Sequence, residues 1–183
     1  MNILANKFDT LFLDRDGVIN FRPTNDYVKT WEQFIFLPGV LDALRILSAH
    51  FTHIIVVTNQ QGIGKNIMSH EDLKMIHDNM ISEIKKHNGR IDSIYYCPDL
   101  ANKSVSCRKP GIKMAEMAKQ DYPKIEFQRC IMVGDTIPDM EFGNNAGMTT
   151  VYVGNILEPA SKLLVNYQFN NLLTFAHSLV AND

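Results

Sequence analysis

The segment that most constrains the fold is the apolar run Leu11–Leu13, which leads directly into Asp14, Arg15, Asp16 and Gly17. In a strand, alternate side chains share a face, so we expect Asp14 and Asp16 to start out in the same direction. Two buried like charges this close are kept only where a cation or a shared proton compensates their repulsion. The segment therefore indicates a Mg2+ site with a nucleophilic or acid–base carboxylate. A solvated strand-to-turn junction is the alternative interpretation.

Two later segments supply groups that handle phosphate. The apolar run Ile54–Val57 leads into Thr58 and Asn59, whose side chains are able to donate hydrogen bonds to a phosphoryl oxygen. Arg108 and Lys109 are adjacent cations just before a helical pattern. Positive charge is needed where the oxygens of a transferring phosphoryl group gather negative charge.

A third segment, Ile131–Gly134, leads into Asp135 and, four residues later, Asp139. These carboxylates would complete an oxygen ligand shell for Mg2+. Taken singly, each of the three segments is also explained by turn, cap or surface residues. Together they favour one site, because ligands bind at the carboxyl ends of the strands in open α/β sheets.

These motifs resemble those of the haloacid dehalogenase (HAD) superfamily of phosphohydrolases. All four superfamily motifs occur in order, as Asp14-x-Asp16, Thr58, Lys109 and Gly134-Asp135-x-x-x-Asp139. Longer matches are similar to one subfamily, at residues 14–20, 57–63, 95–98 and 107–110. That subfamily contains heptose 1,7-bisphosphate 7-phosphatases and histidinol-phosphate phosphatases. The resemblance implies an α/β class, three-layer α/β/α Rossmann-like fold with a central parallel sheet.

The resemblance also implies roles for the matching residues. Asp14 is expected to be the nucleophile that forms an aspartyl-phosphate. Asp16 would act first as general acid and then as base, so we expect its pKa to be raised relative to that of Asp14. Thr58 and Asn59 would hold phosphoryl oxygens, and Lys109 would bridge the phosphate and Asp14.

The metal ligands implied by the resemblance are Asp14, the backbone carbonyl of Asp16, and Asp135. Asp139 would orient a metal-bound water or Lys109. Mg2+ is the expected cofactor, since all of these ligands are oxygens.

Relatives carry a zinc loop before the Arg–Lys pair, and this chain departs from it. The corresponding residues are Cys97, Asp99, Val105 and Cys107. Structural zinc requires four ligands, mostly thiolate or imidazole, so we expect no structural zinc here. The cysteine count of three is odd, with Cys130 opening an apolar strand. Reduced thiols in the cytoplasm are the simplest interpretation.

The chain is expected to form a single domain over residues 1–183, with the motifs within about residues 8–153 and a helical tail at about 159–181. No long insertion suggests a large cap domain. Strands are predicted at Thr10–Asp14, His53–Thr58, Ser93–Tyr96, Cys130–Gly134 and Thr149–Val153. Helical patterns lie at Pro38–His50, after a Ser69 cap, at Gly111–Gln120 and at Ile137–Ala146. The tail either packs on the domain or forms a dimer contact, so we expect a monomer or a weak homodimer.

Composition excludes some partners. The formal net charge is −2, which gives no electrostatic footprint for nucleic acid. No apolar run approaches the roughly 18 residues of a membrane span, and the N-terminus has no signal-peptide core, so a cytoplasmic location is expected. The expected partner is a small phosphorylated metabolite.

We therefore predict a Mg2+-dependent phosphomonoester hydrolase. D-glycero-D-manno-heptose 1,7-bisphosphate is the leading substrate, and histidinol phosphate or another small sugar phosphate is the alternative. The resemblance places Arg108 in contact with substrate beyond the transferred phosphate. Together with Arg22, Lys29 and Lys65 it offers cations for a second phosphate. Two lesser alternatives are a polynucleotide 3′-phosphatase and a non-catalytic phosphosugar-binding module.

Overall fold

A six-stranded parallel sheet forms the centre of the computed structural model, which describes residues 8–155 and 159–180. Its strand order is β3-β2-β1-β4-β5-β6. The strands are β1 (Thr10–Leu13), β2 (His53–Asn59), β3 (Ser93–Cys97), β4 (Cys130–Gly134), β5 (Thr149–Val153) and β6 (Tyr167–Phe169). The predicted parallel sheet is confirmed, with five strands at the expected places. The sixth, β6, was not predicted, because three half-exposed residues carry almost no periodic signal.

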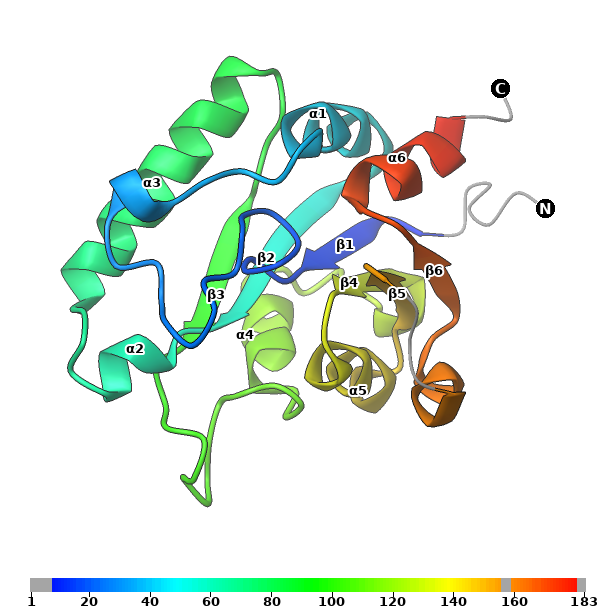
Figure 1. The fold of residues 1–183 in the computed structure, drawn as a ribbon. Coiled ribbons are helices and arrows are strands. Elements are labelled where there is room, and N and C mark those ends of the chain that lie inside the picture. Colours follow the sequence, from blue (N-terminus) through cyan, green and yellow to red (C-terminus); the bar gives the residue numbers. More distant parts are fainter. Residues whose placement is uncertain (1–7, 156–158, 181–183) are drawn as a thin grey trace.

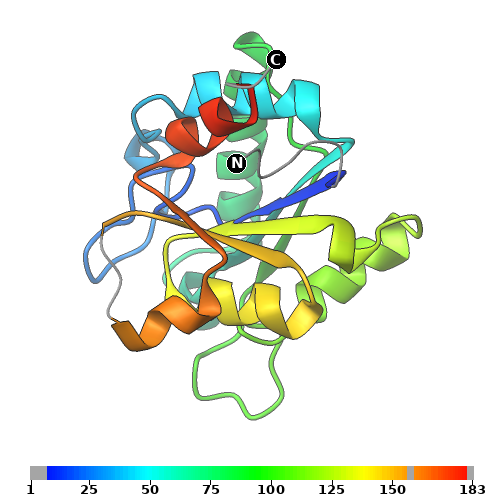
Figure 2. The ribbon, with the colours of Figure 1, turned by 90° about the vertical axis from the view of Figure 1, so that its right-hand side faces the viewer.

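Helices cover both faces of the sheet and produce the three predicted layers (Figure 2). One layer contains α1 (Val40–His50), α3 (His70–Lys86) and α6 (Leu172–Val180), and the other contains α4 (Lys113–Asp121) and α5 (Ile137–Ala146). Short 3-10 helices lie at Trp31–Gln33, Phe127–Arg129 and Pro159–Leu164. The tail helix α6 packs against α1, so of its two expected positions the structure shows the one on the domain.

The two-sided burial of the sheet follows from its apolar strands. Leu11 and Leu13 contact the α1, α3 and α6 layer, whereas Phe12 contacts the α4 and α5 layer. All three side chains are fully buried, and each such burial contributes roughly 1.5–3 kcal/mol. Leu13 pairs with Val56 of β2 and with Val133 of β4. This register brings the residues that follow these three strands to the same edge of the sheet.

Local signals set the helix starts. Ser69 and Asp72 form the expected capping box of α3, with Asp72 N donating to Ser69 Oγ at 3.0 Å and Ser69 N donating to Asp72 Oδ2 at 2.9 Å. After β2 the chain forms the short helix α2 (Gln61–Gly64), which the sequence analysis does not predict. One helical turn with two glycines has too few residues to show a helical period. Among the described residues, no helix has the length and apolarity needed to cross a membrane.

A disulfide joins Cys97, at the end of β3, to Cys107, with Cα atoms 5.5 Å apart. The expectation that all the cysteines are reduced is therefore wrong for these two, and holds for Cys130, which is a free buried thiol. The physical reason is the path of the 98–106 loop, which leaves the sheet edge and returns to it, as the loop hanging below α4 in Figure 1 shows. Asp99 lies close to both cysteines, with its ligand atom and theirs within 4.8 Å of one another. The predicted absence of structural zinc stays a prediction.

The disulfide should stabilise the fold measurably. Closing a loop of this length removes unfolded-state entropy worth roughly 3 kcal/mol, so reduction should lower the melting temperature by roughly 6–12 °C. Thermal melting with and without a phosphine reductant measures the shift. The control is the Cys97→Ser/Cys107→Ser double variant, whose melting temperature should not respond to reductant. If reductant lowered the melting temperature of the double variant equally, the stabilising role of the Cys97–Cys107 disulfide would be contradicted. Stoichiometric zinc in the reduced protein would separately contradict the predicted absence of zinc.

Candidate active site

Polar residues gather where β1, β2 and β4 end, at the edge of the sheet nearest α2 in Figure 1. After β1 the chain adds β2 and β3 on one side of that strand and then β4, β5 and β6 on the other. This reversal makes the end of β1 a topological switch point, which is where α/β folds bind ligands. A cavity of about 350 Å3 opens there. Its lining consists of Asp14, Asp16, Arg22, Tyr27, Thr58, Asn59, Gln61, Arg108, Lys109, Thr136, Pro138 and Asp139.

A buried ion cluster lies at the bottom of the cavity. Lys109 Nζ contacts Asp14 Oδ1 at 2.7 Å and Asp139 Oδ1 at 2.6 Å, and donates to the Val57 carbonyl at 2.8 Å. Burial disfavours the lysine charge, but the attraction of Asp139 and Asp14 outweighs it and raises the pKa of Lys109. Lys109 is therefore a fixed cation beside Asp14.

Three oxygens beside this cluster converge on one point. Asp14 Oδ2, the Asp16 carbonyl oxygen and Asp135 Oδ1 all contact Arg22 Nη2, at 3.3, 2.5 and 2.8 Å. They are the three metal ligands that the family resemblance implies. Their convergence on a positively charged nitrogen shows that the donor set fits a hard cation, which prefers oxygen ligands.

Two glycines permit this close approach. A Cβ atom on Gly17, whose φ is +92°, would lie 2.0 Å from Asp135 Oδ2. A Cβ on Gly134 would lie 2.2 Å from the Cβ of Asp139. Because no other residue leaves this space, the carboxylates of Asp135 and Asp139 pack directly against backbone.

Burial and like charge dominate the electrostatics of the acidic groups. Burial, followed by repulsion from Asp139, raises the pKa of Asp14 to about 7, against the opposing attraction of Lys109. Burial also raises the pKa of Asp135 to about 6, although Arg22 opposes the shift. A divalent cation at the converging oxygens would favour the ionised form of both carboxylates.

Asp16 behaves in the opposite way, and here the sequence-based expectation is wrong. Its carboxylate accepts hydrogen bonds from Arg15 Nη2 at 2.8 and 2.9 Å, from Asn20 Nδ2 at 2.9 Å and from Gln60 Nε2 at 2.9 Å. Burial alone would raise the pKa of Asp16, but the charge and hydrogen bonds of Arg15, with those of Asn20 and Gln60, lower it. The pKa of Asp16 is thus below that of Asp14, because four hydrogen bonds favour the carboxylate form.

Arg15 and His77 form a buried layer beneath Asp16 that the sequence analysis did not identify. Arg15 is 1% exposed, and its Nη1 lies 3.1 Å from His77 Nε2. Burial and the charge of Arg15 lower the pKa of His77 to about 3, so the ring is neutral and accepts from Arg15. His77 is itself buried, with only 6% of it exposed. Because β1 ends at Leu13, strand alternation does not extend to Arg15, and this contact could not be read from the sequence.

The two residues at the end of β2 differ in what they contact. Thr58 is buried and accepts from Gln60 Nε2 at 2.9 Å. The Asn59 amide pairs with the backbone of Lys109, accepting from its N–H at 3.0 Å and donating to its carbonyl at 3.3 Å. Asn59 therefore fixes the position of Lys109.

Of the four cations predicted to bind a second phosphate, two line the cavity and two do not. Arg22 and Arg108 line the cavity, and Arg108 Nη1 donates to the Asp99 carbonyl at 3.1 Å. Lys29 pairs with Asp26 at 2.8 Å, and Lys65 lies over the Tyr27 ring. Neither lysine lines the cavity.

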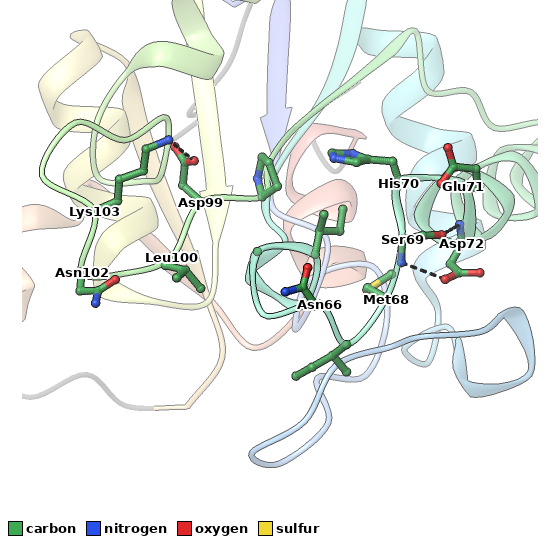
Figure 3. A pocket seen from close by; sticks show the side chains of 14 residues that line it. Asn66, Met68, Ser69, His70, Glu71, Asp72, Asp99, Leu100, Asn102 and Lys103 are labelled. Carbon is green, nitrogen blue, oxygen red and sulfur yellow. Dashed lines mark hydrogen bonds and ion pairs between the residues drawn. The ribbon is translucent and has the colours of Figure 1, made fainter.

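A larger groove of about 1000 Å3 lies beside the site (Figure 3). One side of the groove is lined by Asp99, Leu100, Asn102 and Lys103, and the other side is lined by residues 66–72. The ion pair of Lys103 and Asp99 closes one end of the loop. The groove contains none of the residues predicted from sequence to bind phosphate or metal.

Comparison with known proteins matches these features. A family model described as HAD-hydrolase-like matches residues 106–163. The D-glycero-alpha-D-manno-heptose-1,7-bisphosphate 7-phosphatase of Mycobacterium bovis is 40% identical over 135 residues, covering 74% of this chain and 71% of the relative. The D-glycero-beta-D-manno-heptose-1,7-bisphosphate 7-phosphatase of Escherichia coli K12 is 31% identical over 179 residues, covering 92% of both chains.

A solved structure extends the likeness to the whole fold. It is the D,D-heptose 1,7-bisphosphate phosphatase of B. bronchiseptica, complexed with magnesium and phosphate. The TM-score is 0.84 at 25% identity, over 96% of this chain and all of that one. With the motifs in place at the strand ends, these likenesses show that the chain belongs to the HAD-type phosphatases, in the family of the heptose 1,7-bisphosphate 7-phosphatases.

Proposed function

We propose that this phosphatase removes the 7-phosphate of D-glycero-D-manno-heptose 1,7-bisphosphate, with Mg2+ as cofactor and with Asp14 as the nucleophile. The observation that carries the proposal is the setting of the Asp14 carboxylate. One of its oxygens contacts Lys109 and the other is among the three oxygens that converge on a cation. A carboxylate held between two positive groups can approach a phosphoryl group without prohibitive charge repulsion.

The residues divide the reaction as follows. An Asp14 oxygen attacks phosphorus, the bond from phosphorus to the sugar oxygen breaks, and Asp16 protonates the leaving oxygen. Asp16 then takes a proton from water, which attacks the aspartyl-phosphate and releases phosphate while Asp14 is regenerated. The lowered pKa of Asp16 keeps it in the carboxylate form that the base role of the second step requires. For the first step Asp16 must gain a proton when substrate enters.

The remaining groups position the phosphate and the metal. Thr58 and Lys109 hold phosphoryl oxygens, and Asn59, which also lines the cavity, fixes the Lys109 backbone beside them. Asp14, the Asp16 carbonyl and Asp135 would hold Mg2+. When bound, Mg2+ would supply positive charge worth several kcal/mol to the transition state. Asp139 orients Lys109, which it contacts at 2.6 Å.

The position of Arg108 supports a substrate that carries a second phosphate. This half-buried guanidinium lines the cavity and is fixed by the Asp99 carbonyl, without a carboxylate partner within ion-pair distance among the described residues. A monophosphate would leave that charge unused. The cytoplasmic location, the single-domain organisation and the monomeric or weakly dimeric state stay predictions. Reduced cysteines no longer support a cytoplasmic location, because Cys97 and Cys107 form a disulfide.

The direct test is phosphate release from both anomers of the heptose bisphosphate, beside histidinol phosphate, in Mg2+ and in EDTA. Relatives are named for each anomer, so both are needed. We expect kcat/KM for one anomer at least a hundredfold above that for histidinol phosphate, and no turnover in EDTA. Poor turnover of all three, with Mg2+-dependent hydrolysis of p-nitrophenyl phosphate, would retain the chemistry and reject the sugar.

Asp14→Asn should lower kcat by roughly a thousandfold or more, because the amide is not a nucleophile at phosphorus. The melting temperature should stay within a few degrees of wild type, since the substitution also removes one of several mutually repelling charges. Turnover with p-nitrophenyl phosphate and a thermal melt measure both quantities. Unchanged turnover would rule out an aspartyl-phosphate at this residue.

Lys109→Met and Arg108→Met form a matched pair, since each replaces a cation with an apolar chain of similar length. With p-nitrophenyl phosphate, Lys109→Met should lose at least about a hundredfold in kcat/KM and Arg108→Met less than about fivefold. With the bisphosphate, Arg108→Met should lose substantially more than it does with the aryl phosphate. Equal losses for the pair on both substrates would contradict the division of roles, provided that melting shows both variants folded.

A further inference from the structure

Arg22 has an unusual combination of exposure and contacts. Its side chain is 46% exposed and projects from the loop that follows β1, whereas the Asp14 side chain that it contacts is 6% exposed. A single nitrogen, Nη2, makes all three contacts with Asp14, the Asp16 carbonyl and Asp135. The Arg22 guanidinium therefore places a positive charge at the point where the three oxygens converge, while the side chain stays attached to a partly exposed loop.

The same three oxygens cannot serve Arg22 and a metal together. Mg2+ requires oxygen ligands at about 2.0–2.1 Å in near-octahedral geometry. The point within reach of all three oxygens is the point that Nη2 occupies. Two positive groups at one point would also repel strongly in surroundings this buried. Arg22 must therefore leave the oxygens before a metal binds to them.

We infer that Arg22 is an internal competitor of the metal: it holds the three oxygens together in the metal-free enzyme and is displaced when Mg2+ binds. The inference rests on the proposed metal site and not on the identity of the sugar. Two consequences follow. Arg22 lowers the apparent affinity for Mg2+, and it stabilises the metal-free enzyme by neutralising Asp14 and Asp135.

The loop around Arg22 allows the exchange. Nearly half of the side chain is exposed, and its only ion-pair partners among the described residues are Asp14 and Asp135. Once displaced, the guanidinium stays on the rim of the cavity that Arg108 also lines. The same side chain thus changes from a partner of the carboxylates to a free cation facing the cavity.

The test is the binding of Mg2+ itself, without substrate. Wild type and Arg22→Gln are stripped with EDTA, dialysed, and titrated with MgCl2 by isothermal titration calorimetry. Removing the competing ion pairs should tighten the Kd for Mg2+ by about tenfold. In thermal melts the metal-free variant should unfold at a lower temperature than metal-free wild type, and saturating Mg2+ should remove most of the difference.

Lys29→Gln is the matched control, because it removes the same charge from the same loop without touching the three oxygens. Its Kd for Mg2+ should stay within about twofold of wild type. An unchanged or weaker Kd in Arg22→Gln, or equal tightening in both variants, would overturn the inference. So would failure of Mg2+ to bind any of the three proteins. None of these results depends on turnover, so a wrong sugar substrate would leave the inference standing.

Discussion

Compensation of buried negative charge is the constraint on which the rest of the structure depends. Asp14, Asp135 and Asp139 have ligand oxygens within 4.8 Å of one another. Asp14 and Asp139 are almost completely buried. Carboxylates in such surroundings cost several kcal/mol each unless cations pair with them. Lys109 supplies one cation from a distant loop and Arg22 supplies another. The loops at this edge of the sheet are therefore held where charge balance requires them.

The fold supplies this arrangement with few parts. Parallel strands end at one edge, so β1, β2 and β4 each deliver polar residues to the same place without any long insertion. The loop that carries Lys109 is held twice, by the disulfide of Cys97 with Cys107 and by the Asn59 amide on the Lys109 backbone. The family resemblance implies that relatives have a zinc-binding loop at this position. Here a covalent bond between two of the corresponding residues holds the loop.

Much of this was predictable from sequence, because the signals were local or periodic. Apolar runs located five strands, and the Ser69 cap located the start of α3. The convergence of Asp14, Asp16 and Asp135 followed from strand ends alone. Contacts between distant segments were beyond reach. No spacing shows that Cys97 meets Cys107, that Asn59 turns toward Lys109, or that His77 lies under Arg15. The pKa order of Asp14 and Asp16 was also beyond reach, because it depends on which side chains donate to the Asp16 carboxylate, namely those of Arg15, Asn20 and Gln60.

The strand register of β1 has a consequence for folding. The strand ends at Leu13, and Asp14 follows it directly at the edge of the sheet. A slip of one residue relative to β2 and β4 would displace Asp14 from Lys109, which it contacts at 2.7 Å. Such a slip would also exchange the layers that receive Leu11, Phe12 and Leu13. Correct strand pairing therefore also brings Asp14 to Lys109, so a misregistered chain would lose both the packing of its core and this ion pair.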